Sequence, residues 1–178
     1  MVVRTLITTA DNTTWPKDDN CPLLFLGEWC KRYTKRSEWE KLDAIVAPYH
    51  WNNRKKFFSD YKYLNGLYEQ LLIELSNKLN QIHSVQYSLR YWRILIGPWL
   101  GYFIQILFDR WFMLNQAVSQ NNISQCLILG RDFDSVVPND MEQFVEFMVQ
   151  DDWNEAIYSQ LLKMCWKDQI NLIEFRNK

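Results

Sequence analysis

Glycine is scarce in this chain, and its scarcity excludes several common binding motifs. The 178 residues include five glycines, at positions 27, 66, 97, 101 and 130. Neither the G-x-G-x-x-G dinucleotide fingerprint nor the phosphate-binding P-loop can be formed from these positions. The G-x-S-x-G turn of α/β-hydrolases and the H-E-x-x-H zinc helix are also missing. The sequence therefore offers no signature of an independent hydrolase or metalloenzyme.

Residues that bind metals are sparse as well. The chain has two histidines and four widely spaced cysteines, and no C-x-x-C pair. Neither a zinc site nor a disulfide framework is predicted from this spacing. We expect no metal and no cofactor, and we expect the cysteines to be reduced thiols.

Neither sign of charge is in excess. Twenty basic and 21 acidic residues give a formal net charge of −1. Such a chain has no overall field that would attract nucleic acid or an anionic bilayer. A nucleic-acid partner is therefore not expected.

A long uncharged apolar run is also missing. The longest one, residues 94–108, has 15 residues and contains Gln105, and it is flanked by Arg93 and Asp109. A membrane-spanning helix needs about 20 predominantly apolar residues, so no transmembrane segment is predicted. The amino terminus lacks the apolar core and cleavage site of a secretory signal, which predicts a cytoplasmic location.

Aromatic residues, in contrast, are abundant. The chain is 48% hydrophobic and 16% aromatic, with nine tryptophans. This composition predicts one domain, residues 1–178, with a sizeable core. Most of the tryptophans are expected to pack in that core, and a minority to line a ligand pocket.

Hydrophobic patterning predicts an α/β fold with a large helical component. Short β-branched or apolar runs favour strands, and apolar positions spaced by three or four favour helices. The expected strands are residues 4–9, 23–26 and 123–129, and the expected helices include 57–82, 139–149 and one that begins at Asp151 or Asp152.

The apolar stretch around Gly97 and Pro98 predicts a helix pair. Proline cannot donate to the helical ladder and crowds the carbonyl of Ile94, so a helix from Leu89 should stop or kink near Gly97, and a second should follow. Gly97 and Gly101 form a G-x-x-x-G spacing, which favours close helix packing inside the domain over a dimerisation face in lipid.

Candidate site residues stand at expected strand ends and helix starts. Gly27 ends the second expected strand, where α/β sheets place ligands. Glu28 follows it and is a candidate to bind a hydroxyl group or to act as a base. An equally good interpretation is that this acid only stabilises a helix amino terminus through the helix dipole. His50 precedes the long helix and is a candidate general base, or else bonds its own loop.

Two arginines beside aromatic residues form a second candidate site. Arg90 and Arg93 lie on either side of Tyr91 and Trp92. Guanidinium groups in this setting bind carboxylates or phosphates in a bidentate manner, or else stack on the rings or pair with an acid of the core.

Several stretches together resemble a known family. They are RTLITTADNTTW, PLLFLGEWC, PYHWNNRKK, SLRYWRILIGPWLGYFIQILFDRW, NDMEQF and DDWNEAIYSQLL. In this order they are similar to the amino-terminal region of bacterial transferases encoded among surface-polysaccharide (O-antigen) biosynthesis genes. The resemblance covers nearly the whole chain.

The resemblance implies a Rossmann-like domain with a small parallel sheet. It corresponds to the acceptor-side half of a two-domain, glycosyltransferase-like protein, whose donor-binding half would follow. The implied partners are a nucleotide sugar and a saccharide acceptor. A pocket with Trp29, Trp51 or Trp92 in its wall is then expected, with Glu28 or His50 as the base.

Two alternatives remain open at this level. One is a non-catalytic protein-binding or assembly module, which would form a homo-oligomer. The other is a peripheral membrane protein that uses the tryptophan-rich stretch as an interfacial face.

Overall fold

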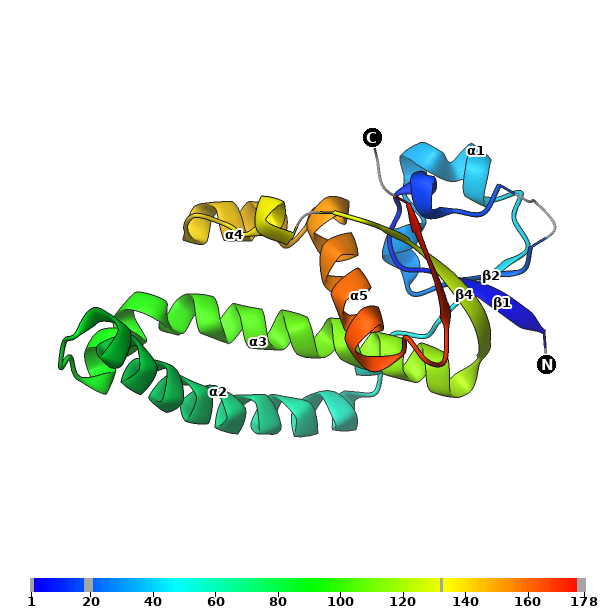
Figure 1. Ribbon diagram of the computed structural model, residues 1–178. Coiled ribbons are helices and arrows are strands. Elements are labelled where there is room, and N and C mark those ends of the chain that lie inside the picture. Colours follow the sequence, from blue (N-terminus) through cyan, green and yellow to red (C-terminus); the bar gives the residue numbers. More distant parts are fainter. Residues whose placement is uncertain (1, 18–20, 132, 176–178) are drawn as a thin grey trace. The chain divides into compact units, whose positions relative to one another are not determined.

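The computed structural model describes residues 2–17, 21–131 and 133–175 and has an α/β fold. Its sheet is parallel throughout, in the order β3-β2-β1-β4-β5. The strands are β1 (Val3–Ile7), β2 (Leu23–Phe25), β3 (Ala44–Val46), β4 (Asn122–Leu129) and β5 (Asn171–Phe175). The α-helices are α1 (Arg36–Trp39), α2 (Arg54–His83), α3 (Leu89–Gln120), α4 (Met141–Phe147) and α5 (Asp151–Cys165) (Figure 1).

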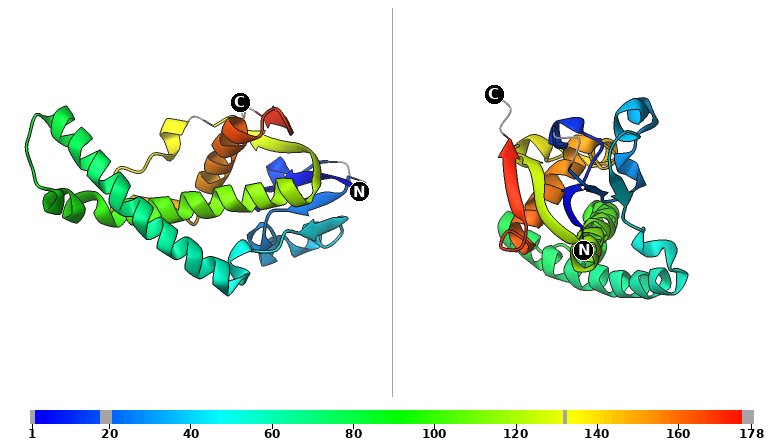
Figure 2. Two further views of the ribbon diagram at one scale, coloured as in Figure 1. Left: turned by 90° about the horizontal axis from the view of Figure 1, so that it is seen from below. Right: turned by 90° about the vertical axis from the view of Figure 1, so that its right-hand side faces the viewer.

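The chain divides into two compact units. The sheet unit consists of residues 1–49 and 110–178, and the hairpin unit of residues 50–109. The hairpin unit contains α2 and the first part of α3, which lie side by side (Figure 2). Whether residues 1–178 act as one domain stays a prediction.

The three predicted strands are confirmed as β1, β2 and β4, with small shifts at their ends. Two further strands were not predicted. β3 has three residues, none of them fully buried, and β5 carries Glu174 on a partly exposed edge. Both are edge strands, where alternation of apolar and polar side chains is weakest as a signal because packing constrains fewer positions.

The strand order contains a point at which the direction of winding reverses. The chain runs from β1 to β2 and β3 on one side, and then returns to place β4 and β5 on the other side of β1. The loops that leave β1 and β4 therefore diverge at the carboxyl edge of the sheet. Open α/β sheets bind ligands at such a switch point.

The core of the sheet unit joins the strands to α3 and α5. Its fully buried side chains include Leu24 and Phe25 of β2, Leu114 of α3, and Tyr158 and Leu162 of α5. Burial of this apolar surface holds the two helices against the sheet and so positions the amino terminus of α5.

The long amphipathic helix is confirmed as α2. The Asn53 side chain caps its amino terminus by accepting hydrogen bonds from the backbone N–H groups of Lys55 and Lys56. Ser84, in the left-handed conformation at φ 54°, ends it. Such a residue at the end of a helix lets its last carbonyls find partners.

The predicted end of a helix near Gly97, with a second helix after it, is wrong, because α3 continues through Pro98 as one helix. Pro98 is exposed, and so is Ile94, whose side chain is 71% accessible. Water can therefore satisfy the Ile94 carbonyl that loses its helical donor. The turns on both sides pack on α2 through Leu100 and Ile96, which offsets the cost of the proline.

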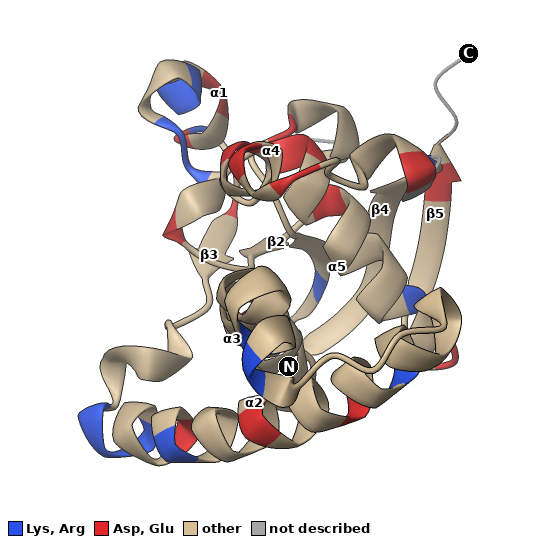
Figure 3. Cartoon of the chain, turned by 90° about the vertical axis from the view of Figure 1, so that its left-hand side faces the viewer, with Lys and Arg blue, Asp and Glu red and all other residues tan. Residues whose placement is uncertain are grey.

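Within the described ranges, no helix combines the length and the apolar character that crossing a bilayer requires. Charged residues interrupt both long helices (Figure 3).

Candidate functional site

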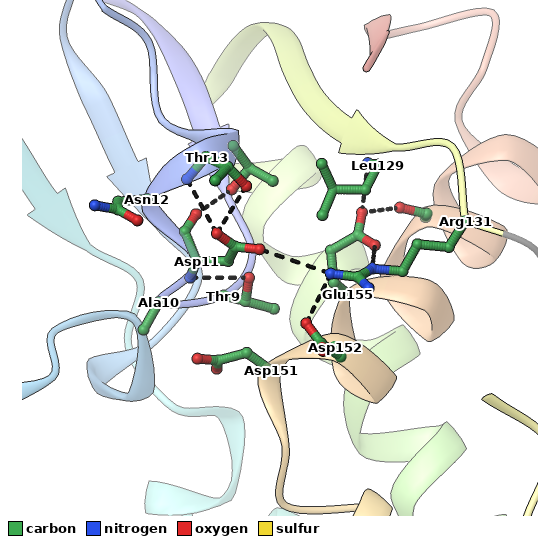
Figure 4. A network of polar contacts seen from close by, with 12 residues as sticks. Thr9, Ala10, Asp11, Asn12, Thr13, Leu129, Arg131, Asp151, Asp152 and Glu155 are labelled. Carbon is green, nitrogen blue, oxygen red and sulfur yellow. Dashed lines mark hydrogen bonds and ion pairs between the residues drawn. The ribbon is translucent and has the colours of Figure 1, made fainter. Parts of the chain in front are cut away.

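The carboxyl edge of the sheet collects polar side chains at the switch point. Asp11 lies in the loop after β1, where it caps the short 3-10 helix η1 (Asn12–Thr14). Arg131 follows Gly130 directly after β4, and Asp152 and Glu155 lie in the first turns of α5. Three segments that are distant in sequence thus meet at one place (Figure 4).

Arg131 is surrounded by carboxylates. One of its terminal nitrogens donates to Asp152 Oδ1 at 2.7 Å and lies 3.8 Å from Asp11 Oδ2. Its Nε lies 3.5 Å from Glu155 Oε2. The guanidinium therefore links the β1 loop, the β4 loop and α5.

Glu155 is a buried acid that ties α5 to the end of β4. Its side chain is 1% accessible, and Oε1 accepts hydrogen bonds from the Leu129 backbone N–H at 2.7 Å and from Ser159 Oγ at 2.5 Å. Burial raises the pKa of Glu155, an effect that these hydrogen bonds and the charge of Arg131 only partly oppose.

Asp11 is held by its own loop. Its Oδ1 accepts hydrogen bonds from the backbone N–H of Thr13 at 3.0 Å and from Thr13 Oγ1 at 2.7 Å. These bonds fix the carboxylate so that Oδ2 points toward Arg131. The described residues offer no group of three His, Cys, Asp or Glu side chains arranged to hold a metal ion.

A cavity of about 310 Å³, called here the edge cavity, opens at the same edge of the sheet unit. Its polar and aromatic lining residues are Thr9, Trp29, Arg32, Arg110, Asp151, Asn154 and Tyr158.

The two arginines of the edge cavity are held in place by groups at the start of α5. Arg32 pairs with Asp151 at 2.8 Å, and Arg110 Nε donates to Asn154 Oδ1 at 3.0 Å. The Asn154 side-chain amide in turn donates to the carbonyl of Gln150 at 2.8 Å. The cavity therefore presents two oriented arginines beside the amino terminus of a helix, and Asp151 in the first turn of that helix is the counter-charge of Arg32.

Three of the predicted site residues lie in the sheet unit. Trp29 is 37% exposed, lines the edge cavity, and donates from Nε1 to the Thr8 carbonyl at 2.9 Å. Gly27 makes room for this indole, because a Cβ atom at position 27 would lie 2.2 Å from the ring. Glu28 is exposed and pairs with Lys31 at 3.2 Å.

The other predicted site residues lie in the hairpin unit. His50 is buried, and its Nε2 lies 3.0 Å from Asp109 Oδ1. Trp51 packs on His50 and donates from Nε1 to Asp60 Oδ2 at 2.9 Å.

Of the two predicted arginines, Arg93 pairs with Glu69 through two hydrogen bonds of 2.6 Å, and Arg90 is exposed. Arg93 thus pairs with an acid, but Glu69 is exposed and is not the core acid that was expected. Neither arginine lines the edge cavity.

Asp11, Arg32, Arg110, Arg131 and Glu155 were not selected from the sequence. Asp11 and Arg131 did carry a signal, because each follows an expected strand within a few residues. Glu155 carried none, since its burial and its contact with Leu129 arise only when α5 packs beside β4.

The sheet unit contains two buried cysteine thiols, Cys30 and Cys126. Burial raises the pKa of Cys30 to about 12 and also raises that of Cys126. Cysteine reacts as the thiolate, so neither group is activated as a nucleophile. All four cysteines are free thiols, as predicted.

Comparison with known proteins gives a match at the level of the family. The model of the LIC12162 family transferase matches residues 4–178. Neither the curated proteins nor the solved structures yield a significant match. The matched range includes every strand from β2 to β5, both long helices, and all residues of the edge cavity. The chain therefore belongs to the LIC12162 family of transferases.

Proposed function

We propose that this chain is a glycosyltransferase-like domain that binds a phosphorylated saccharide in the edge cavity. One observation carries the proposal: Arg32, Arg110 and Trp29 surround a cavity at the carboxyl edge of a parallel sheet, in a chain of a transferase family. A nucleotide sugar has both the phosphate groups and the sugar ring that such a wall accommodates. The proposal thus assigns the donor to this chain, whereas the resemblance implied that a following half binds it.

Charge accounts for the phosphate part of this ligand. Guanidinium groups match phosphate oxygens with paired hydrogen bonds. Arg32 would exchange Asp151 for a phosphate oxygen, and Arg110 would keep its orientation through Asn154. No side chain caps the amino terminus of α5, so its first N–H groups can serve the same anion.

The aromatic residue accounts for the sugar part. Trp29 is partly exposed in the cavity wall and is fixed by its hydrogen bond to Thr8. A fixed, half-exposed ring offers an apolar face to a pyranose at little entropic cost.

The proposed reaction transfers the sugar to an acceptor hydroxyl. The acceptor oxygen forms a bond to the anomeric carbon, and the bond from that carbon to the diphosphate oxygen breaks with its electron pair on the diphosphate. The acceptor proton passes to a base, for which Glu28 is the candidate within the sheet unit, because it lies between Gly27 and the cavity residue Trp29 in the chain. Arg32 and Arg110 stabilise the charge that develops on the leaving diphosphate.

A role in surface-polysaccharide (O-antigen) biosynthesis and a cytoplasmic location belong to the same proposal. The biosynthetic role rests on the resemblance of the motifs quoted above, and the location stays the prediction that was made from the sequence. A saccharide acceptor is the second partner that this role requires.

The test uses inorganic pyrophosphate, the chemical group shared by nucleotide diphosphate sugars, with isothermal titration calorimetry. The native chain should bind it, and Arg110→Gln should weaken binding about 10-fold or more, because a hydrogen bond to a charged group is worth about 1.5–3 kcal/mol. Arg36→Gln is the matched control, since Arg36 is an exposed arginine paired with Glu40 outside the cavity.

Circular dichroism of each variant establishes that it is folded. The proposal would be contradicted if the native chain and a folded Arg110→Gln variant bound pyrophosphate with equal affinity. It would also be contradicted if the native chain did not bind pyrophosphate.

A further inference from the structure

The hairpin unit contains a second and larger hollow, a groove of about 430 Å³ between α2 and α3. Its lining includes Asn65 and Tyr68 from α2 and Arg93, Gly97, Tyr102 and Gln105 from α3. All of these residues belong to residues 50–109, so the groove is complete within this unit.

Two glycines explain why there is space between the helices. A Cβ atom at Gly97 would lie 2.6 Å from Tyr68 Oη, so only glycine lets this hydroxyl rest against the backbone of α3. A Cβ atom at Gly101 would lie 3.8 Å from the Tyr68 ring, an ordinary contact that would occupy part of the groove. The G-x-x-x-G spacing thus allows a close approach and leaves a hollow beside it.

The charge of the groove is balanced. Arg93 is its charged lining residue, and Glu69 neutralises it through two hydrogen bonds of 2.6 Å. An anionic ligand would have to displace Glu69, whereas a neutral ligand would leave this pair intact. The edge cavity has a second arginine, Arg110, whereas Arg93 is the one arginine that lines the groove. The groove is therefore better suited to a ligand without net charge.

The remaining polar groups are amides and phenols. Asn65 and Gln105 are both exposed and supply carboxamides that donate and accept hydrogen bonds, one from each helix. Tyr102 is 52% exposed and offers a ring face with a hydroxyl at its edge. Alternating apolar faces and hydroxyl-bonding groups are complementary to a pyranose, which has apolar C–H faces and equatorial hydroxyl groups.

We propose that this groove is a binding site for a neutral saccharide, separate from the edge cavity. Tyr102 contacts the apolar face of the sugar ring, and Asn65 and Gln105 bond its hydroxyl groups. Gly101 keeps the site open. The proposal does not depend on pyrophosphate binding at the edge cavity.

The test is binding of the full chain to an array of immobilised neutral and acidic glycans. We expect the native chain to bind a subset of neutral glycans, and Tyr102→Ala to lower this signal at least 10-fold. Tyr61→Ala is the matched control, because Tyr61 is 53% exposed on α2 and is not a lining residue of the groove.

A second pair of variants tests the space itself. Gly101→Leu should fill the groove and abolish glycan binding, whereas Gly66→Leu should leave binding unchanged, because a Cβ atom at Gly66 meets no atom within 4 Å. Circular dichroism and the thermal midpoint show whether both variants fold.

The proposal is overturned if the native chain binds no glycan or only acidic glycans, or if a folded Gly101→Leu variant binds as the native chain does. Retention on phosphatidylcholine vesicles in place of glycans would also overturn it and would identify the groove as a lipid-contacting surface. Pyrophosphate binding measured on Gly101→Leu reports on the edge cavity alone. A failure of the groove proposal can therefore be distinguished from a failure of the edge-cavity proposal.

Discussion

At the scale of single residues, Glu155 and Arg131 decide how the carboxyl edge is built. Glu155 is almost completely buried, yet one of its oxygens receives two hydrogen bonds, from the end of β4 and from α5 itself. The other faces Arg131, which also contacts Asp152 and Asp11. Burying an acid is costly unless it is paired in this way, so these contacts fix the helix to the strand in one position.

The raised pKa of Glu155 predicts a pH-dependent stability. The folded state holds the proton more tightly than the unfolded chain, in which the pKa of a glutamate carboxyl group is near its ordinary value of 4.5. The stabilising contribution is complete below that value and is lost as the pH rises through the folded pKa. We expect the native chain to lose stability relative to Glu155→Gln as the pH increases from about 4.5.

Urea denaturation of both proteins at a series of pH values measures this difference. The buried Ser159 and the ion-pair partner Arg131 are unchanged in the variant, so the comparison isolates the titration of one carboxyl group. A native chain that gains stability relative to the variant over the same range would show that the folded pKa is lowered instead.

At the scale of elements, the two long helices differ in how well their local sequence predicts them, because tertiary contacts override the local sequence in one of them. α2 follows its apolar periodicity, and its caps are formed by Asn53 and Ser84. α3 contradicts its strongest local signal, because Pro98 lies inside it. Tertiary contacts with α2 on both sides of the proline outweigh the lost hydrogen bond, which costs about 3 kcal/mol in an isolated helix.

Glycine substitutions in these helices should have different effects. Gly66→Ala should raise the free energy of unfolding by about 1 kcal/mol, because alanine is the better helix former and its methyl group meets open space. Gly97→Ala should gain less or lose stability, because its methyl group would displace the Tyr68 hydroxyl.

Chemical denaturation followed by circular dichroism compares the two variants with the native chain. An equal gain in the free energy of unfolding in both variants would mean that the contact between Gly97 and Tyr68 does not restrict the residue at position 97. A lower free energy of unfolding in Gly66→Ala would mean that position 66 needs the conformational freedom of glycine.

At the scale of the whole molecule, each of the two compact units has an apolar core of its own among the described residues. One surrounds Leu24 and Leu114 in the sheet unit, and the other surrounds Leu72 and Leu100 in the hairpin unit. The edge cavity depends on the first core and the groove on the second. Each proposed site is therefore supported by its own packing.

This division predicts that core truncations act locally. Leu24→Ala should cost about 2–5 kcal/mol and reduce amide protection in the strands, whereas Leu72→Ala should reduce protection chiefly within residues 50–109. Both leucines are fully buried, so the deletions are matched. Hydrogen exchange read by mass spectrometry measures the pattern, and loss of protection throughout the chain in Leu72→Ala would show a single cooperative unit.

The sequence by itself determined the fold class, three of the five strands and the long amphipathic helix, because alternation and helical periodicity are local consequences of burying one face of an element. It also pointed to Gly27 and Trp29 at the edge of the sheet. Only the tertiary structure decided the remainder. The edge strands, the unbroken α3 and the joining of Asp11, Arg131 and Glu155 depend on contacts between segments far apart in sequence, and no local pattern records the free energy of those contacts.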